Sequence, residues 1–166
     1  MGFKTAEQLS DLQDIRDAAA RYCHGVDRLD GDWMKSAYWP EATDDHGTFV
    51  GNAWAFVDRC MVSQARFRST LHCILNHSIE LAPDGVTANG EIYNVTYLFP
   101  IDGAAWIWVG RYLDHYEKRG DEWRILRRVC VHEGTSQLPA TPAAYPVEKF
   151  RQGSFDRGVP GRPLGP

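Results

Sequence analysis

The sequence lacks the features that would place it among nucleic-acid-binding, membrane or secreted proteins. Its 18 Lys and Arg are outnumbered by 22 Asp and Glu, which leaves a formal charge of -4 and excludes a basic surface for nucleic acid. No apolar run approaches the roughly 20 residues that a membrane-spanning helix requires. The first residues lack the apolar core of a secretory signal, so we expect a cytoplasmic protein.

Cysteine is sparse, and its spacing matches no common motif. The four cysteines, at positions 23, 60, 73 and 130, form neither a C-x-x-C pair nor the spacing of a zinc site. In a reducing compartment we expect all four to remain free thiols. No cofactor motif is present, and we therefore expect any chemistry to be carried by side chains alone.

What the sequence does contain is enough apolar material for one core. A chain of 166 residues with 43% hydrophobic and 24% charged residues is typical of a single globular domain. Aromatic residues make up 12%, with six Trp and seven Tyr. That content suits a pocket for flat or apolar ligands, although core packing uses the same residues.

The first third of the chain has the apolar period of helices. Thr5 and Gln8 have the spacing of a capping box, which marks a helix start. Apolar residues follow at three- or four-residue steps, at Leu9, Leu12, Ile15, Ala19, Tyr22 and Val26. We expect the glycines at 25 and 31 to weaken and end this helix. A short second helix capped by Asp32, a strand over 43–50 and a third helix over 52–66 are predicted to follow.

After Phe67 the pattern changes to that of β-strands. Residues 69–81, 87–99, 105–118 and 122–135 are rich in Val, Ile, Tyr, Trp and Thr, and short turn sequences separate them. Short connections favour an antiparallel meander. We predict an α+β fold in which three N-terminal helices pack against a long curled antiparallel sheet.

The last 30 residues differ in composition from the rest. They are rich in Pro and Gly, which excludes regular secondary structure, and we place the domain at 1–136 and a tail or arm at 137–166. One hypothesis is a mobile tail. The other is an ordered arm over a pocket mouth or a neighbouring subunit, anchored by Tyr145, Phe150 and Phe155.

Asp27 is the first candidate for chemistry. It stands at the predicted end of the first helix, where a carboxylate opposes the helix macrodipole and gains no local stabilisation. Cys23, one helical turn earlier, is of an inward type, so Asp27 is predicted to face the core with His72 as its partner. The alternative is a solvated carboxylate that pairs with Arg21 or Arg28.

His72 is the second candidate. On a regular strand it alternates with Asn76, and we predict that the two share a ligand-lining face while His77 lies on the opposite, structural face. An exposed or core-satisfied histidine is the alternative. A carboxylate and an imidazole in one apolar cavity form a general acid–base pair.

Further polar residues fall on the last strand and on the short strand over 43–50. Arg128 and His132 occur in an otherwise apolar strand, and a buried Arg needs a counter-charge from a protein carboxylate or a ligand. His46 follows two aspartates. A metal site formed by His46, His72, His132 and Asp27 is conceivable, but their spacing does not indicate one.

Together these residues resemble the SnoaL-like branch of the NTF2-like, cone-shaped α+β superfamily. The resemblance covers roughly residues 8–135. It is carried by Arg21 and Tyr22 with Gly25 to Asp27, 42–47, His72 with Asn76, 79–80, 110–112, and 123–128. The superfamily includes scytalone dehydratase, hexachlorocyclohexane dehydrochlorinase, polyketide cyclases and ketosteroid isomerase, so the resemblance specifies the fold better than the reaction.

The resemblance also implies roles for particular residues. In the dehydratase and dehydrochlorinase members an Asp at the helix end orients a His on the first long strand, which abstracts a proton, and Asp27 and His72 match these positions. Tyr22 falls where the dehydrochlorinase has a pocket lysine. Arg128 matches a pocket-lining position on the last strand and, with His132, is a further catalytic candidate. The residues that we predict to bind substrate are Asn76, Asn94, Thr96, Tyr112 and His46. Polar Asn94 and Thr96 replace apolar residues of the dehydrochlorinase, which favours a substrate with hydroxyl or phenol groups.

The leading hypothesis is a cofactor-independent lyase without a metal. His72, held in one tautomer by Asp27, removes a proton, and Tyr22, Arg128 or His132 assists departure of water, halide or an aldehyde. By analogy with related lignin-degrading enzymes, formaldehyde release from diaryl compounds is one narrower form. The alternatives are an isomerase or aldol cyclase, a non-catalytic ligand-binding domain, and a dioxygenase small subunit. We expect a homodimer or homotrimer that acts on a small molecule.

Overall fold

Three helices form the N-terminal part of the protein. The computed structural model describes residues 4–139 and 146–150. It places α1 at Ala6–Asp27, α2 at Gly31–Lys35, α3 at Ala53–Ser63 and the short 3-10 helix η1 at Gln64–Arg66. The predicted capping box is present, since the Thr5 hydroxyl accepts from the Gln8 backbone and the Gln8 side chain accepts from the Thr5 backbone.

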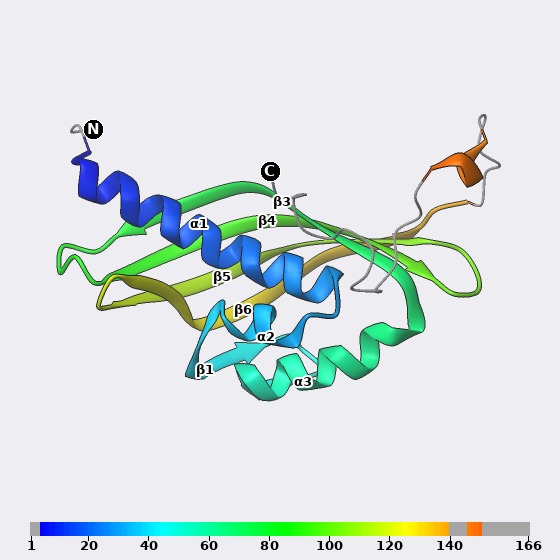
Figure 1. Cartoon of the computed structure of the whole chain (residues 1–166), viewed down its shortest axis with the longest axis horizontal. Helices are drawn as coiled ribbons and strands as arrows, with labels where there is room; N and C mark the ends of the chain where they lie inside the picture. The colour runs from blue at the N-terminus through cyan, green and yellow to red at the C-terminus, as the bar shows by residue number, and fades with distance from the viewer. Residues whose placement is uncertain (1–3, 140–145, 151–166) are drawn as a thin grey trace.

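Six strands form one sheet behind these helices. They are β1 (Tyr38–Asp45), β2 (Val50–Asn52), β3 (Phe67–Leu81), β4 (Thr87–Pro100), β5 (Trp106–Arg119) and β6 (Glu122–Gln137). Their order is β2-β1-β6-β5-β4-β3. Figure 1 shows α1 lying across one face of the sheet, with α2 and α3 beside β1. The architecture is the predicted α+β fold.

The sheet is mixed, whereas an antiparallel one was predicted. The four long strands form the expected antiparallel meander. β1, however, pairs in parallel with β6. β1 also begins five residues earlier than the predicted strand and contains Pro40 near the edge of the sheet. The second helix is therefore shorter than expected, and Asp30 rather than Asp32 caps it, through the Trp33 N–H.

Four register shifts interrupt the pairing of the long strands, and two of them change which side chains meet in the core. The pairing of β3 with β4 shifts register between Ile74 and His77, and that of β5 with β6 shifts between His115 and Tyr116. Each shift inserts an extra residue, so side chains beyond it change face relative to a regular strand. The prediction that His72 and Asn76 share a face is wrong for this reason: Asn76 is exposed, whereas His77 packs against the buried ring of Tyr116.

The core lies between α1 and the concave face of the sheet. Its largest fully buried side chains include Trp123, Tyr22, Tyr38, Tyr116 and Ile15. Gly25, which is inside α1 rather than at its end, lets α2 approach closely, because a Cβ there would lie 2.5 Å from the Met34 backbone nitrogen. None of the helices in the described ranges is long and apolar enough to cross a membrane.

Beyond β6 the structure describes residues 138–139 and 146–150. Leu138 donates its N–H to the Ala105 carbonyl, and a short 3-10 helix, η2, spans Val147–Lys149. Phe150, one of the predicted anchors, is exposed. Tyr145 and Phe155 lie outside the described residues.

Candidate active site

A cavity of about 250 Å³ opens between the helices and the concave face of the sheet. Aromatic and apolar side chains form most of its wall, and a few polar groups converge on it. Its lining consists of Tyr22, Val26, His46, Gly47, Phe56, Cys60, Gln64, His72, Thr96, Leu98, Trp108, Tyr112, Cys130 and His132.

The structure brings Asp27 into direct contact with His72, which lines this cavity, whereas Asp27 itself is not a lining residue. The last residue of α1 projects its carboxylate onto β3, where Oδ1 lies 2.6 Å from His72 Nδ1. The Thr70 hydroxyl donates to Oδ1 at 2.8 Å, and the His72 backbone N–H donates to Oδ2 at 2.8 Å. Three donors fit an ionised carboxylate, which places the imidazole proton on Nδ1. Nε2 is then left with a lone pair that can accept a proton.

A second aspartate–histidine pair faces the same cavity. Asp44 on β1 is buried and accepts from His46 Nδ1 and, at 2.6 Å, from the Tyr38 hydroxyl. His46 Nε2 lies 3.2 Å from the Tyr22 hydroxyl. The His46 ring also stacks on Phe56 at 4.1 Å between centroids. Sequence reasoning noted the acidic neighbours of His46 but missed this pairing, which alternation along β1 (Asp44 inward, Asp45 outward) could have indicated.

Arg128 does not line the cavity, contrary to the prediction that it contacts substrate. It is fully buried and makes a bidentate pair with Asp114, with distances of 2.7 and 2.6 Å from its Nε and Nη2. Its guanidinium carbon lies 4.3 Å from the Tyr22 ring centroid and 4.2 Å from that of Tyr112. The counter-charge is therefore a protein carboxylate, and Arg128 lies behind two lining tyrosines. The sequence did not single out Asp114.

The remaining predicted contacts divide into two groups. Thr96, Tyr112 and His132 line the cavity, and the exposed His132 approaches Thr135 with Nε2 at 2.8 Å from the hydroxyl oxygen. Asn94 is buried behind the wall, where it accepts from the Thr96 hydroxyl at 2.7 Å. Asn76 lies outside the cavity because of the register shift in β3.

Burial keeps the weak acids of the cavity wall protonated. Burial raises the pKa of Tyr22 and of Tyr112 well above the usual range for a phenol. Burial likewise raises the pKa of the Cys60 and Cys130 thiols to about 12, so neither is a ready thiolate nucleophile. Among the described residues all four cysteines are free thiols, and no three His, Cys, Asp or Glu side chains lie close enough together to hold a metal ion.

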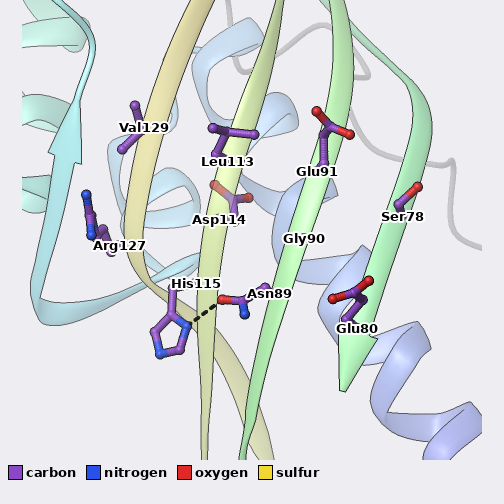
Figure 2. Close-up of a pocket in the computed structure, with 10 residues that line it drawn as sticks. All are labelled: Ser78, Glu80, Asn89, Gly90, Glu91, Leu113, Asp114, His115, Arg127 and Val129. Carbon is purple, nitrogen blue, oxygen red and sulfur yellow. Dashed lines mark hydrogen bonds between the residues drawn. The ribbon is translucent and has the colours of Figure 1, made fainter. Parts of the chain in front are cut away.

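A second hollow, of about 460 Å³, lies on the opposite face of the sheet. Figure 2 shows Glu80, Glu91, Asn89 and Arg127 around it, with α1 behind the sheet. His115 Nδ1 donates to Asn89 Oδ1 at 2.9 Å there, and no carboxylate among the described residues forms a hydrogen bond with this ring. Within residues 4–139 and 146–150, this face thus has no aspartate–histidine pair like those at the cavity.

Comparison with protein families agrees with this architecture. Residues 7–129 match the family model of the SnoaL-like domain. No curated protein matches the chain.

Solved structures share the fold at low sequence identity. A candidate scytalone dehydratase from Novosphingobium aromaticivorans superposes with a TM-score of 0.74 at 18% identity, over 89% of this chain and 100% of that chain. The dehydrochlorinase LinA-type3 from Novosphingobium barchaimii gives 0.73 at 17% identity, over 84% and 98%. A candidate aromatic ring hydroxylase from N. aromaticivorans gives 0.70 at 21%, over 78% and 94%. At these identities the likeness shows the fold alone.

Proposed function

Because the chain belongs to the SnoaL-like domain family of the NTF2-like superfamily, we propose that it is a cofactor-independent lyase acting on a small hydroxylated aromatic compound. The observation that carries the proposal is the contact of Asp27 with His72, whose ring lines an aromatic cavity. The similar structures named for dehydratase and dehydrochlorinase activity support elimination as the reaction type.

The proposed reaction begins at His72. Asp27 holds the proton on Nδ1, so Nε2 removes a proton from the substrate carbon or hydroxyl. The imidazolium that forms is stabilised by the adjacent carboxylate. Tyr22 lies in the wall and can assist departure of the leaving group, and His132 lines the same cavity.

The polar part of the wall supports a hydroxylated substrate. The hydroxyl of Thr96 and the phenols of Tyr22 and Tyr112 are interspersed with apolar Val26, Leu98 and Trp108. Flat rings pack well on such surfaces, whereas hydroxyl groups find hydrogen-bond partners. We therefore propose a role in the degradation of aromatic compounds in the cytoplasm. Formaldehyde release from lignin-derived diaryl compounds is a more specific form of this proposal.

His72→Ala tests the proposal. Metal-free wild type and variant are incubated with a panel of hydroxylated and phenolic compounds, and products are followed by mass spectrometry. We expect wild type to form a product lighter by water, halide or formaldehyde, and the variant to lose at least about 100-fold in kcat, the lower end for positioned acid–base help. Near-normal turnover by the variant would contradict the assignment, whereas a product of unchanged mass would indicate an isomerase.

We also propose that the protein assembles through the outer face of its sheet. Large hydrophobic residues are exposed on β3, β4 and β5 there: Leu71, Leu75, Tyr93, Val109 and Leu113. Apolar side chains gathered on one sheet face favour burial against another surface. A homodimer or homotrimer satisfies this requirement with no partner other than the chain itself.

A further inference from the structure

The cavity contains two histidines that are each oriented by an aspartate, and the proposed lyase uses only one of them as a base. The second pair, Asp44 and His46, comes from β1 and the turn that follows it. His46 Nδ1 is engaged by Asp44, so Nε2 is the nitrogen that faces the cavity side, next to the Tyr22 hydroxyl. A pair of this kind can hold a proton as well as accept one.

We propose that Asp44, His46 and Tyr22 form the acid of the reaction, and that they deliver a proton to an oxygen leaving group on the substrate. This inference rests on the proposed lyase function and narrows it: the compound loses water rather than halide. A halide departs as a stable anion, whereas hydroxide is a poor leaving group and departs as water only if it is protonated. An acid built opposite the base is therefore expected for an oxygen leaving group.

The step balances with the groups present. His72 Nε2 takes the proton of a substrate C–H bond, and the electron pair of that bond forms the carbon–carbon double bond. The C–O bond then breaks, and its electron pair stays on the oxygen, which receives the Tyr22 proton. In this proposal His46 begins the step with a proton on each ring nitrogen, passes the Nε2 proton to Tyr22 and is left neutral, with Nδ1 still bonded to Asp44. Water leaves with the unsaturated product, and exchange with solvent moves the proton from His72 back to His46.

The surroundings of Tyr22 support a relay rather than a phenolate. Burial raises the pKa of Tyr22 well above its usual range, so the residue does not give up its proton unless another replaces it. His46, 3.2 Å away, supplies the replacement. The buried guanidinium of Arg128, 4.3 Å from the Tyr22 ring, stabilises negative charge that develops on the phenol during transfer.

The other polar groups of the wall fit the same assignment. His132 has no carboxylate partner within the described part of the chain and is exposed at the rim, so it lacks the means to hold a proton that His46 has. The buried Gln64 Oε1 lines the cavity and accepts no hydrogen bond from the described residues. A substrate hydroxyl is a donor that this oxygen can accept.

The test compares two leaving groups on one carbon skeleton. The probes are 4-hydroxy-4-phenylbutan-2-one and 4-chloro-4-phenylbutan-2-one, which give the same enone, followed by its absorbance. His46→Asn retains a donor near the Nδ1 position for Asp44 but has no group at Nε2, and His46→Gln places an amide near Nε2 that cannot supply an acidic proton. Tyr22→Phe and His72→Ala complete the set.

We expect both His46 variants and Tyr22→Phe to slow loss of water about 100-fold more than loss of chloride, because only the first needs the acid. Equal slowing of both reactions, or wild-type turnover of the chloride alone, would overturn the inference and leave the base assignment intact. Turnover retained by His72→Ala, or no enzyme-dependent reaction with either probe, would instead count against the proposed function.

A spectroscopic measurement tests the acid without turnover. The ¹H–¹⁵N spectrum of wild type labelled in histidine reports which ring nitrogens carry protons, and His46→Asn identifies the signals of that ring. A proton on His46 Nε2 is expected, because that nitrogen is the donor toward Tyr22. A bare Nε2 would show that His46 accepts from Tyr22 and would overturn the proposal.

Discussion

At the scale of single residues, the site depends on carboxylates that fix imidazole orientation. Asp27 makes three hydrogen bonds that converge on one point, two of them with His72. The carboxylate therefore positions the backbone of β3 as well as the imidazole ring. Oδ1 holds the ring and Oδ2 accepts from the backbone, so the ring cannot rotate without losing its bond to a carboxylate that is itself fixed on β3.

Asp27→Asn tests this positioning. The amide is similar in shape, but its NH₂ group cannot accept from Nδ1–H, so the ring is expected to adopt the other tautomer and lose its basic Nε2. We expect kcat to fall by about 10²–10⁴-fold with little change in the melting temperature, measured by turnover and by circular dichroism. Thr70→Val is the matched control, since it removes one donor to Asp27 and leaves the imidazole contact. A comparable loss in both variants would contradict the tautomer argument.

The buried pair of Arg128 and Asp114 leads to a prediction about stability. Both side chains are fully buried, so removal of one leaves an uncompensated charge in the core. We expect Arg128→Met or Asp114→Asn to lower the free energy of unfolding by about 3–5 kcal/mol, measured by urea denaturation. The double variant removes both charges and should be more stable than either single variant. If the loss in the double variant equals the sum of the losses in the two single variants, the two charges are not coupled.

At the scale of elements, the register shifts in β3 and β6 determine which side chains meet. The shift in β3 turns His77 inward, where its Nε2 lies 3.4 Å from the Tyr116 hydroxyl. The shift beside Leu126 brings Arg128 to the face already occupied by Trp123 and Ile125. In regular strands without these shifts, His77 and Arg128 would each lie on the opposite face of the sheet.

His77 makes stability depend on pH. Burial lowers its pKa to about 4, although Asp114 nearby partly offsets this effect. The unfolded chain binds the proton near pH 6.5 and the folded chain does not, so stability is expected to fall as pH decreases from about 6.5 towards 4. Urea denaturation at pH 7 and pH 5 should show a smaller loss for His77→Gln than for wild type. An identical loss in both proteins would rule out His77 as the source.

At the scale of the whole molecule, the sheet presents two faces of different character. The concave face holds the cavity lined by His46 and His72. The outer face carries the exposed hydrophobic residues and the second hollow, whose lining Figure 2 shows. A strand side chain points to only one face of the sheet. Substitutions on the outer face should therefore affect assembly without altering the side chains that line the cavity.

Leu113→Glu tests assembly through the outer face. Leu113 is 39% exposed and lies opposite Glu91 on the neighbouring strand, so a second carboxylate there introduces repulsion and a desolvation cost on burial. We expect light scattering to show a dimer or trimer for wild type and a smaller species for the variant. Val62→Glu on α3, also exposed, is the control and should leave the mass unchanged. A monomeric wild type would contradict the assembly proposal.

Periodicity and turn chemistry in the sequence determined the helices, the four long strands and their antiparallel meander, because these depend on local propensity and on the burial of one face. They also led to Asp27 and His72, since a carboxylate at a helix C-terminus has no local reason to be there. Only the tertiary structure decided the parallel pairing of β1 and the register shifts that exclude Asn76 and bury His77. It likewise decided the partners Asp44 and Asp114, because contacts between distant segments depend on how the strands align in space, which local sequence does not encode.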